Sequence, residues 1–295
     1  MYSTVGLLKN SKHSGKLIGT HQRLDKIARA LFARLAPEDV DFPTYKEIVH
    51  FEGTRGPDGL KRKSPGVDEP MHFILPDDDD GKLVQMIKNH QHNLKIALKD
   101  HNRERSAFEA SWLAHAITDG LTPAHHFPYE QAISELMSDK DYVTIFGQPI
   151  KGIMRGDSLK QTAHNNWLYW GPEGYMTKHI AYEYRVAMIT KRKTMKSLTP
   201  KLSRKEISRL KDYSSLDLTA EFYNSLKKIH ELKMYDTFRE EGWTTDLSRD
   251  TAQILLPEIV KMITIGWLSA LPEKPITEKP ITDNHITDKD QNAKA

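Results

Sequence analysis

The sequence predicts an all-α fold, built as one helical domain over residues 1–271. Apolar residues recur every three or four positions along 17–35, 82–120, 216–234 and 250–271, which is the period of helices that bury one face. A chain of 295 residues can bury a large core within one domain. Its composition, 28% charged and 38% hydrophobic, is typical of a soluble globular protein.

The first helix is expected to begin at Thr20, since a threonine before an apolar periodic run is a good N-cap. Leu24, Ile27 and Leu31 then face the core. This start places His21 in the first turn of the helix.

Residues 37–80 are expected to form a long irregular loop, because glycine and proline are frequent throughout them. Long loops inside compact domains usually have a function. This one carries Asp58 and His72.

Helical periodicity resumes from Lys82 to about Gly120, where no proline interrupts the pattern. Three histidines of this stretch have charged neighbours and are expected to be solvent-exposed: His90, His92 and His101. Residues 129–175 are predicted to be an inserted segment rich in tyrosine, tryptophan and glycine. Its aromatic residues would either line a substrate cleft or pack loops.

The C-terminal part contains a basic run and a repeat. Residues 191–211 carry nine lysines and arginines against one acid, as in a solvated face or a surface for phosphate backbones or anionic headgroups. Pro257 predicts a kink or helix boundary. Residues 272–295 repeat a five-residue unit and are expected to be a disordered tail.

One stretch has the spacing of a metal site. His115 and Asp119 lie four residues apart, so a helix would place both on one face. Gly120 should loosen that helix, and Thr122-Pro123 would start a new one with His125 in its first turn. These three side chains would then converge at one corner.

A second pair repeats this spacing, because His179 precedes Glu183 by four residues. The chain has no cysteine, which excludes disulfides and thiolate metal sites. Histidine nitrogens and carboxylate oxygens together suit Zn²⁺ when no thiolate is present. A single histidine and acid at this spacing more often form a surface hydrogen bond. The presence of two such residue pairs therefore favours a metal role.

The order H-x3-D-x5-H followed by H-x3-E resembles the zinc-dependent phospholipase C and S1/P1 nuclease superfamily. Two further segments share the resemblance. They are Thr20-His21 near the N-terminus and Met71-His72-Phe73, with Asp58 fourteen residues before His72 (72 minus 58). The resemblance implies an all-helical phospholipase C/P1 nuclease type of domain with up to three zinc ions.

The resemblance also implies how the ligands divide among the ions. One zinc would be held by Asp58, His72, His115 and Asp119, a second by His125, His179 and Glu183, and His21 with Asp119 would be available to a third. Two zinc ions are expected and the third stays open, because family members use an N-terminal tryptophan where this chain has methionine. Asp58 is the expected catalytic carboxylate, orienting the attacking water.

The predicted function is therefore that of a zinc-dependent phosphodiesterase, phospholipase C-like or single-strand nuclease-like. Its substrate could be a phospholipid headgroup, a nucleic acid or a small phosphoester, since a net charge of +3 does not select nucleic acid. The alternative is a non-catalytic helical metal-binding protein of the same fold. An HD-type phosphohydrolase is not favoured, because the chain has no His-Asp dipeptide.

No signal peptide or run of 18 apolar residues is visible, which predicts a cytoplasmic protein without a transmembrane segment, although relatives are often secreted. No obligate protein partner is evident from the sequence.

Overall fold

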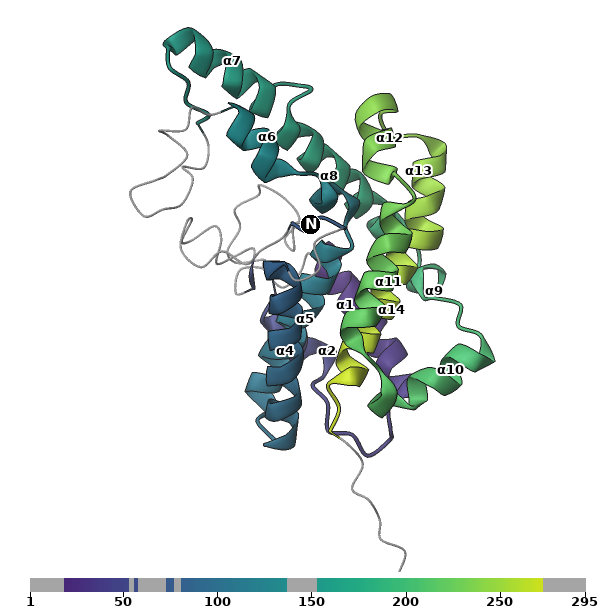
Figure 1. Ribbon diagram of the computed structural model, residues 1–295. Helices are drawn as coiled ribbons and strands as arrows, with labels where there is room; N and C mark the ends of the chain where they lie inside the picture. Colours follow the sequence, from purple (N-terminus) through teal and green to yellow (C-terminus); the bar gives the residue numbers. More distant parts are fainter. Residues whose placement is uncertain (1–18, 53–55, 58–72, 77–80, 137–152, 273–295) are drawn as a thin grey trace, which may run out of the picture.

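The protein is described from a computed structural model that covers residues 19–52, 56–57, 73–76, 81–136 and 153–272 (Figure 1). Within these ranges every regular element is a helix, which confirms the predicted all-α fold. Asp58, His72 and the predicted tail after Pro272 lie outside the described residues.

Four helices form the centre of the molecule: α1 (Thr20–Leu35), α4 (Lys82–Lys99), α5 (Arg103–Gly120) and α14 (Leu256–Ser269). α14 packs against both α1 and α5, and α4 lies along α5. The Trp267 side chain of α14 is fully buried and its indole N–H donates to the Ala110 carbonyl oxygen over 2.9 Å. Gly266 allows this close approach, because a Cβ there would lie 2.8 Å from Cδ1 of Ile117.

Four helices from the C-terminal half of the sequence surround this centre: α8 (Tyr175–Arg192), α11 (Leu218–His230), α12 (Met234–Glu241) and α13 (Thr245–Asp250). The short elements that connect them and the core are α2 (Tyr45–His50), η2 (Pro123–His126), α6 (Tyr129–Leu136), α7 (Leu159–Trp170), α9 (Met195–Leu198), α10 (Arg204–Lys211), η3 (Tyr213–Ser215) and η4 (Thr251–Leu255).

In the predicted inserted segment 129–175, the described residues form helices joined by short non-helical stretches at 153–158 and 171–174. It holds α6 and α7, and α7 packs on α8. Figure 1 shows α6 and α7 at one end of the molecule, away from the central helices. The Trp167 and Trp170 side chains of α7 are exposed, so they do not line a buried cleft.

The described part of the region 37–80 is less irregular than predicted, because it contains α2. Thr44 caps this helix, and its hydroxyl and Glu47 form a reciprocal capping box. A loop rich in glycine and proline can thus still hold one helical turn and a half where a good cap is present.

The last described helices, α13, η4 and α14, form one continuous run. η4 is a π-helical turn before α14, and Pro257 lies in the first turn of α14, at the predicted helix boundary. The described run Thr245–Ser269 is long and apolar enough to cross a membrane, but 78% of its apolar window is buried, as in a core helix. Its apolar face is therefore accounted for by packing against the central helices.

Candidate metal centre

A first cluster of buried ligand-type side chains comes from α1, from α5 and from the segment that follows α2. We call His21, Glu52, His115 and Asp119 the first cluster; each is at most 3% exposed. His21 lies in the first turn of α1, His115 and Asp119 lie one turn apart on α5, and Glu52 follows α2. One donor atom from each of His21, Glu52 and His115 can be chosen so that all three lie within 4.8 Å of one another.

Asp119 connects the two histidines of the first cluster. Its Oδ1 lies 3.3 Å from Nε2 of His21, and its Oδ2 lies 3.2 Å from Nε2 of His115. The two imidazole rings stack with centroids 4.1 Å apart. On the other side of its ring, His115 Nδ1 lies 3.2 Å from Oε1 of Glu52.

The electrostatics of the first cluster favour positive charge. Burial alone would lower the pKa of His115, but Asp119 and Glu52 outweigh it and raise that pKa well above its ordinary value. Without a metal, a proton on His115 would therefore compensate the carboxylates. A divalent cation could replace that proton and compensate more of the charge.

Asp25 is a further buried acid beside the first cluster and was not among the predicted ligands. It lies on α1 one turn after His21 and is 1% exposed. Burial, followed by the charge of Glu52, raises its pKa well above the ordinary value, and His115 acts in the opposite direction. The spacing from His21 to Asp25 is the same four-residue step that identified the other two pairs.

Several buried polar atoms here make no hydrogen bond within the described part of the chain. Nε2 of His21 and Nε2 of His115 still face the Asp119 carboxylate, whereas Nδ1 of His21 and Oδ2 of Asp25 are also without a hydrogen bond. Buried polar groups are normally paired, and an unpaired one costs about 1–3 kcal/mol. Such orphaned donor and acceptor atoms next to clustered carboxylates fit a site that binds a cation through nitrogen and oxygen.

A second cluster consists of His125, His179 and Glu183, which are all buried. Oε1 of Glu183 lies 3.1 Å from Nε2 of His125 and 3.1 Å from Nε2 of His179. The two imidazole rings stack in parallel, with centroids 5.0 Å apart. The geometry places three ligand-type atoms around one point.

The second cluster holds His125 in the form that binds metals. Burial lowers the pKa of His125 to about 3, partly offset by Asp119 and Glu183, so its imidazole is neutral near pH 7. Burial would raise the pKa of Glu183, but neighbouring positive charge, including that of His179, and hydrogen bonds from His125 and His179 hold it well below its usual range. The carboxylate is thus ionised.

Asp119 relates the two clusters. Its charge acts on His125 as well as on His21 and His115, because η2 follows directly after α5. Gly120, predicted to loosen the helix, instead ends α5 and allows close packing: a Cβ there would lie 2.7 Å from the ring of Phe222 and 2.9 Å from Leu83. This packing fixes the corner between Asp119 and His125.

The structure brings together six of the predicted ligands in two groups: His21, His115 and Asp119 in the first cluster, and His125, His179 and Glu183 in the second. Asp58 and His72 lie outside the described residues. Glu52, which was not among the predicted ligands, lies beside His115. No spacing marks Glu52 in the sequence, because only the packing of α2 on α5 brings it there.

His90 differs from its prediction as an exposed residue. Its side chain is 13% exposed, and its Nδ1 lies 2.5 Å from Oε2 of the fully buried Glu109. This pair joins α4 to α5, the helix that carries His115. His92 and His101 are exposed, as predicted.

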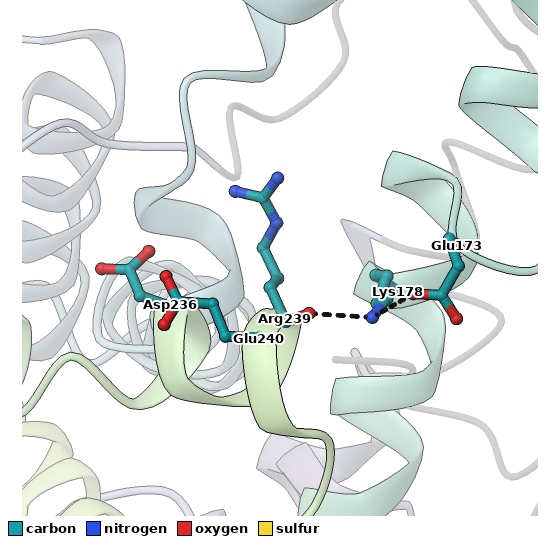
Figure 2. Close-up of a pocket in the computed structure, with 5 residues that line it drawn as sticks. All are labelled: Glu173, Lys178, Asp236, Arg239 and Glu240. Atoms are coloured by element: carbon teal, nitrogen blue, oxygen red, sulfur yellow. Dashed lines mark hydrogen bonds and ion pairs between the residues drawn. The ribbon is translucent and has the colours of Figure 1, made fainter.

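A cavity of about 220 Å³ lies between α8 and α12, lined by Glu173, Lys178, Asp236, Arg239 and Glu240 (Figure 2). Nζ of Lys178 bonds Glu173 and the carbonyl oxygen of Arg239, at 2.6 and 2.9 Å. The Arg239 guanidinium stacks on Phe127. None of the six described metal-ligand candidates is among the residues that line this cavity.

No family model matches the chain, and no curated protein matches it in sequence. Among solved structures, the chain is similar to the alpha-toxin of Clostridium perfringens from avian strain SWCP, with 13% identity and a TM-score of 0.46. The similarity covers 85% of this chain, which spans 62% of the length of the toxin chain. It is a distant relationship in fold and carries no inference about activity.

Proposed function

We propose that this protein is a zinc-dependent hydrolase of phosphate esters. The observation that supports this best is the pair of buried clusters, built from four histidines and three carboxylates, with Asp119 acting on both. The order of these ligands along the chain resembles that of the phospholipase C and S1/P1 nuclease superfamily.

The ligand atoms of the two clusters favour zinc. It contains imidazole nitrogens and carboxylate oxygens, which suit zinc when no cysteine is present. Zinc, when bound, would neutralise charge on the phosphate and lower the pKa of a bound water toward neutrality. We expect two zinc ions, one in each cluster, and leave a third open.

The protein's own residues would act as follows. In the first cluster His21, His115 and Asp119 would be ligands, with Glu52 either a ligand or the acceptor of the His115 Nδ1 proton. In the second cluster all three residues would be ligands. Asp58 remains our proposed base, and His72 a proposed ligand.

The substrate would be a phosphoester anion: a phospholipid headgroup, single-stranded nucleic acid or a small phosphodiester. Buried histidines and carboxylates with their fixed orientation would position it, and the carboxylates would accept the proton of the attacking water. No described residue distinguishes among these three substrate classes.

The test combines metal analysis with activity. Protein purified without chelator should contain two or three zinc ions per chain and hydrolyse at least one of bis(p-nitrophenyl) phosphate, phosphatidylcholine and single-stranded DNA. His115→Asn should lose both zinc and activity. The matched control is His92→Asn, which alters an exposed histidine on α4. Less than one zinc per chain, or equal activity of the two variants, would contradict the proposal.

One observation favours the alternative of a non-catalytic metal-binding protein. Every described member of the two clusters is at most 7% exposed, and a structural metal site has a closed coordination sphere. Full zinc occupancy without turnover of any of the three substrates would support this alternative instead.

A further inference from the structure

Two buried tyrosines connect His179 to α12. Tyr129, the first residue of α6, places its Oη 3.0 Å from Nδ1 of His179. The same Oη lies 2.8 Å from Oη of Tyr235 on α12. Since Nε2 of His179 faces Glu183, the two ring nitrogens of His179 have different neighbours.

The chemistry of a metal-bound histidine sets the direction of these bonds. Binding through Nε2 requires the proton to be on Nδ1, and that N–H needs an acceptor. Tyr129 Oη is within reach to accept it. A phenol carries only one proton, so Tyr129 then donates to Tyr235 Oη.

We propose that Tyr129 and Tyr235 form a hydrogen-bond chain that holds His179 as an imidazole protonated on Nδ1 and presents Nε2 to a metal in the second cluster. Both are positioning residues, because they act through His179. This proposal rests on the proposed metal site, but not on which reaction that site performs.

Aromatic packing fixes the hydroxyl of Tyr129. Its ring meets the ring of His179 edge to face at 5.3 Å, and Phe73 packs against it at 4.9 Å. Phe73 also approaches both histidines of the second cluster, at 5.4 Å from His125 and 6.0 Å from His179. The hydroxyl therefore lies at the end of a ring that cannot easily turn away.

The hydrogen-bond chain of Tyr129 and Tyr235 compensates for a difference in negative charge between the two clusters. Three buried carboxylates, those of Asp25, Glu52 and Asp119, lie at or beside the first cluster, whereas Glu183 is the one carboxylate that the described residues contribute as a ligand to the second. Tyrosine hydroxyls orient a histidine without adding charge. The second cluster thus depends more on the orientation of its ligands than on attraction by negative charge.

The test is zinc affinity of the second cluster in Tyr129→Phe, measured by competition with a chromophoric chelator, with the histidine NMR signals reporting which cluster fills. Loss of a hydrogen bond to a ligand from outside the coordination sphere typically costs about 10–100-fold in affinity. We expect a loss in this range at the second cluster, unchanged affinity at the first, and a shifted visible absorption of the cobalt-substituted protein. Tyr235→Phe should give a smaller loss in the same direction.

The matched control is Tyr182→Phe. Tyr182 is fully buried and packs on Tyr235 at 5.3 Å, but its hydroxyl makes no hydrogen bond among the residues described. Its removal should leave both affinities and the cobalt spectrum unchanged.

Wild-type affinity and cobalt spectrum in folded Tyr129→Phe would overturn the proposal, as would an equal loss in Tyr182→Phe. If Tyr129→Phe does not fold, Tyr235→Phe decides, because Tyr235 hydrogen-bonds Tyr129 and is not itself a proposed ligand. Unchanged affinity in Tyr235→Phe would overturn the proposed hydrogen-bond chain. If the protein binds zinc but turns over no substrate, the proposed hydrolase function is rejected, while the comparison of zinc affinities among the tyrosine variants still tests this proposal. A wild-type protein that binds no metal would overturn both proposals.

Discussion

Asp119→Asn is the substitution that should affect the first cluster most. It keeps the size of a fully buried side chain but removes the charge that lies within 3.3 Å of both His21 and His115. Two unit charges about 4 Å apart interact by about 4 kcal/mol at an effective dielectric constant of about 20. Because each 1.4 kcal/mol changes a dissociation constant about tenfold, we expect zinc affinity of the first cluster to fall by roughly 10³-fold.

The assay is a competition titration of metal-free protein at pH 7 with a chromophoric chelator. A second readout is the pKa of His115 in the metal-free protein, which should fall because Asp119 is the principal charge that raises it. Glu104→Gln is the control, since Glu104 is an exposed carboxylate on the same helix. A loss of zinc affinity below tenfold in folded Asp119→Asn would refute the reasoning.

Three further predictions concern other parts of the centre. Glu183→Gln should reduce zinc at the second cluster while helical circular dichroism stays near wild type, because core contacts such as those of Val186 also hold α8; a loss of helix equal to full unfolding would contradict this. Asp58→Asn should lower turnover by about 100-fold or more, which is the range expected when a general base is lost. Its zinc content should fall by a smaller factor than its turnover. Full activity of this variant would reject Asp58 as the base. In metal-free protein, burial lowers the pKa of His126 to about 4. Its contribution to stability is therefore fully present above the unfolded pKa of about 6.5 and is lost, up to about 3 kcal/mol, as pH falls toward 4. Denaturant unfolding of His126→Gln should show a weaker pH dependence over that range, and an unchanged dependence would contradict it.

The sequence predicted those parts of the site that depend on local geometry. His115 with Asp119, and His179 with Glu183, lie on helices, where a four-residue step places side chains on one face whatever the tertiary structure. Asp25 follows His21 by the same step and could have been found in the same way. The helix start was also predicted to within one residue, since Gly19 and not Thr20 is the N-cap of α1.

Other features depend on tertiary contacts that spacing does not encode. His21 meets His115 because α1 and α5 both pack against α14, and Glu52 reaches His115 because α2 packs on α5. His90 has charged neighbours in sequence, yet α5 covers it and supplies Glu109. The hydrogen-bond chain from Tyr235 to His179 joins residues 56 positions apart (235 minus 179), which no local pattern indicates.

The most direct test of two metal sites in this protein is anomalous X-ray scattering at the zinc edge from crystals of protein purified without chelator. We predict one peak among His21, Glu52, His115 and Asp119, and another among His125, His179 and Glu183. Absence of both peaks in zinc-containing crystals, or zinc bound only elsewhere on the surface, would contradict the account.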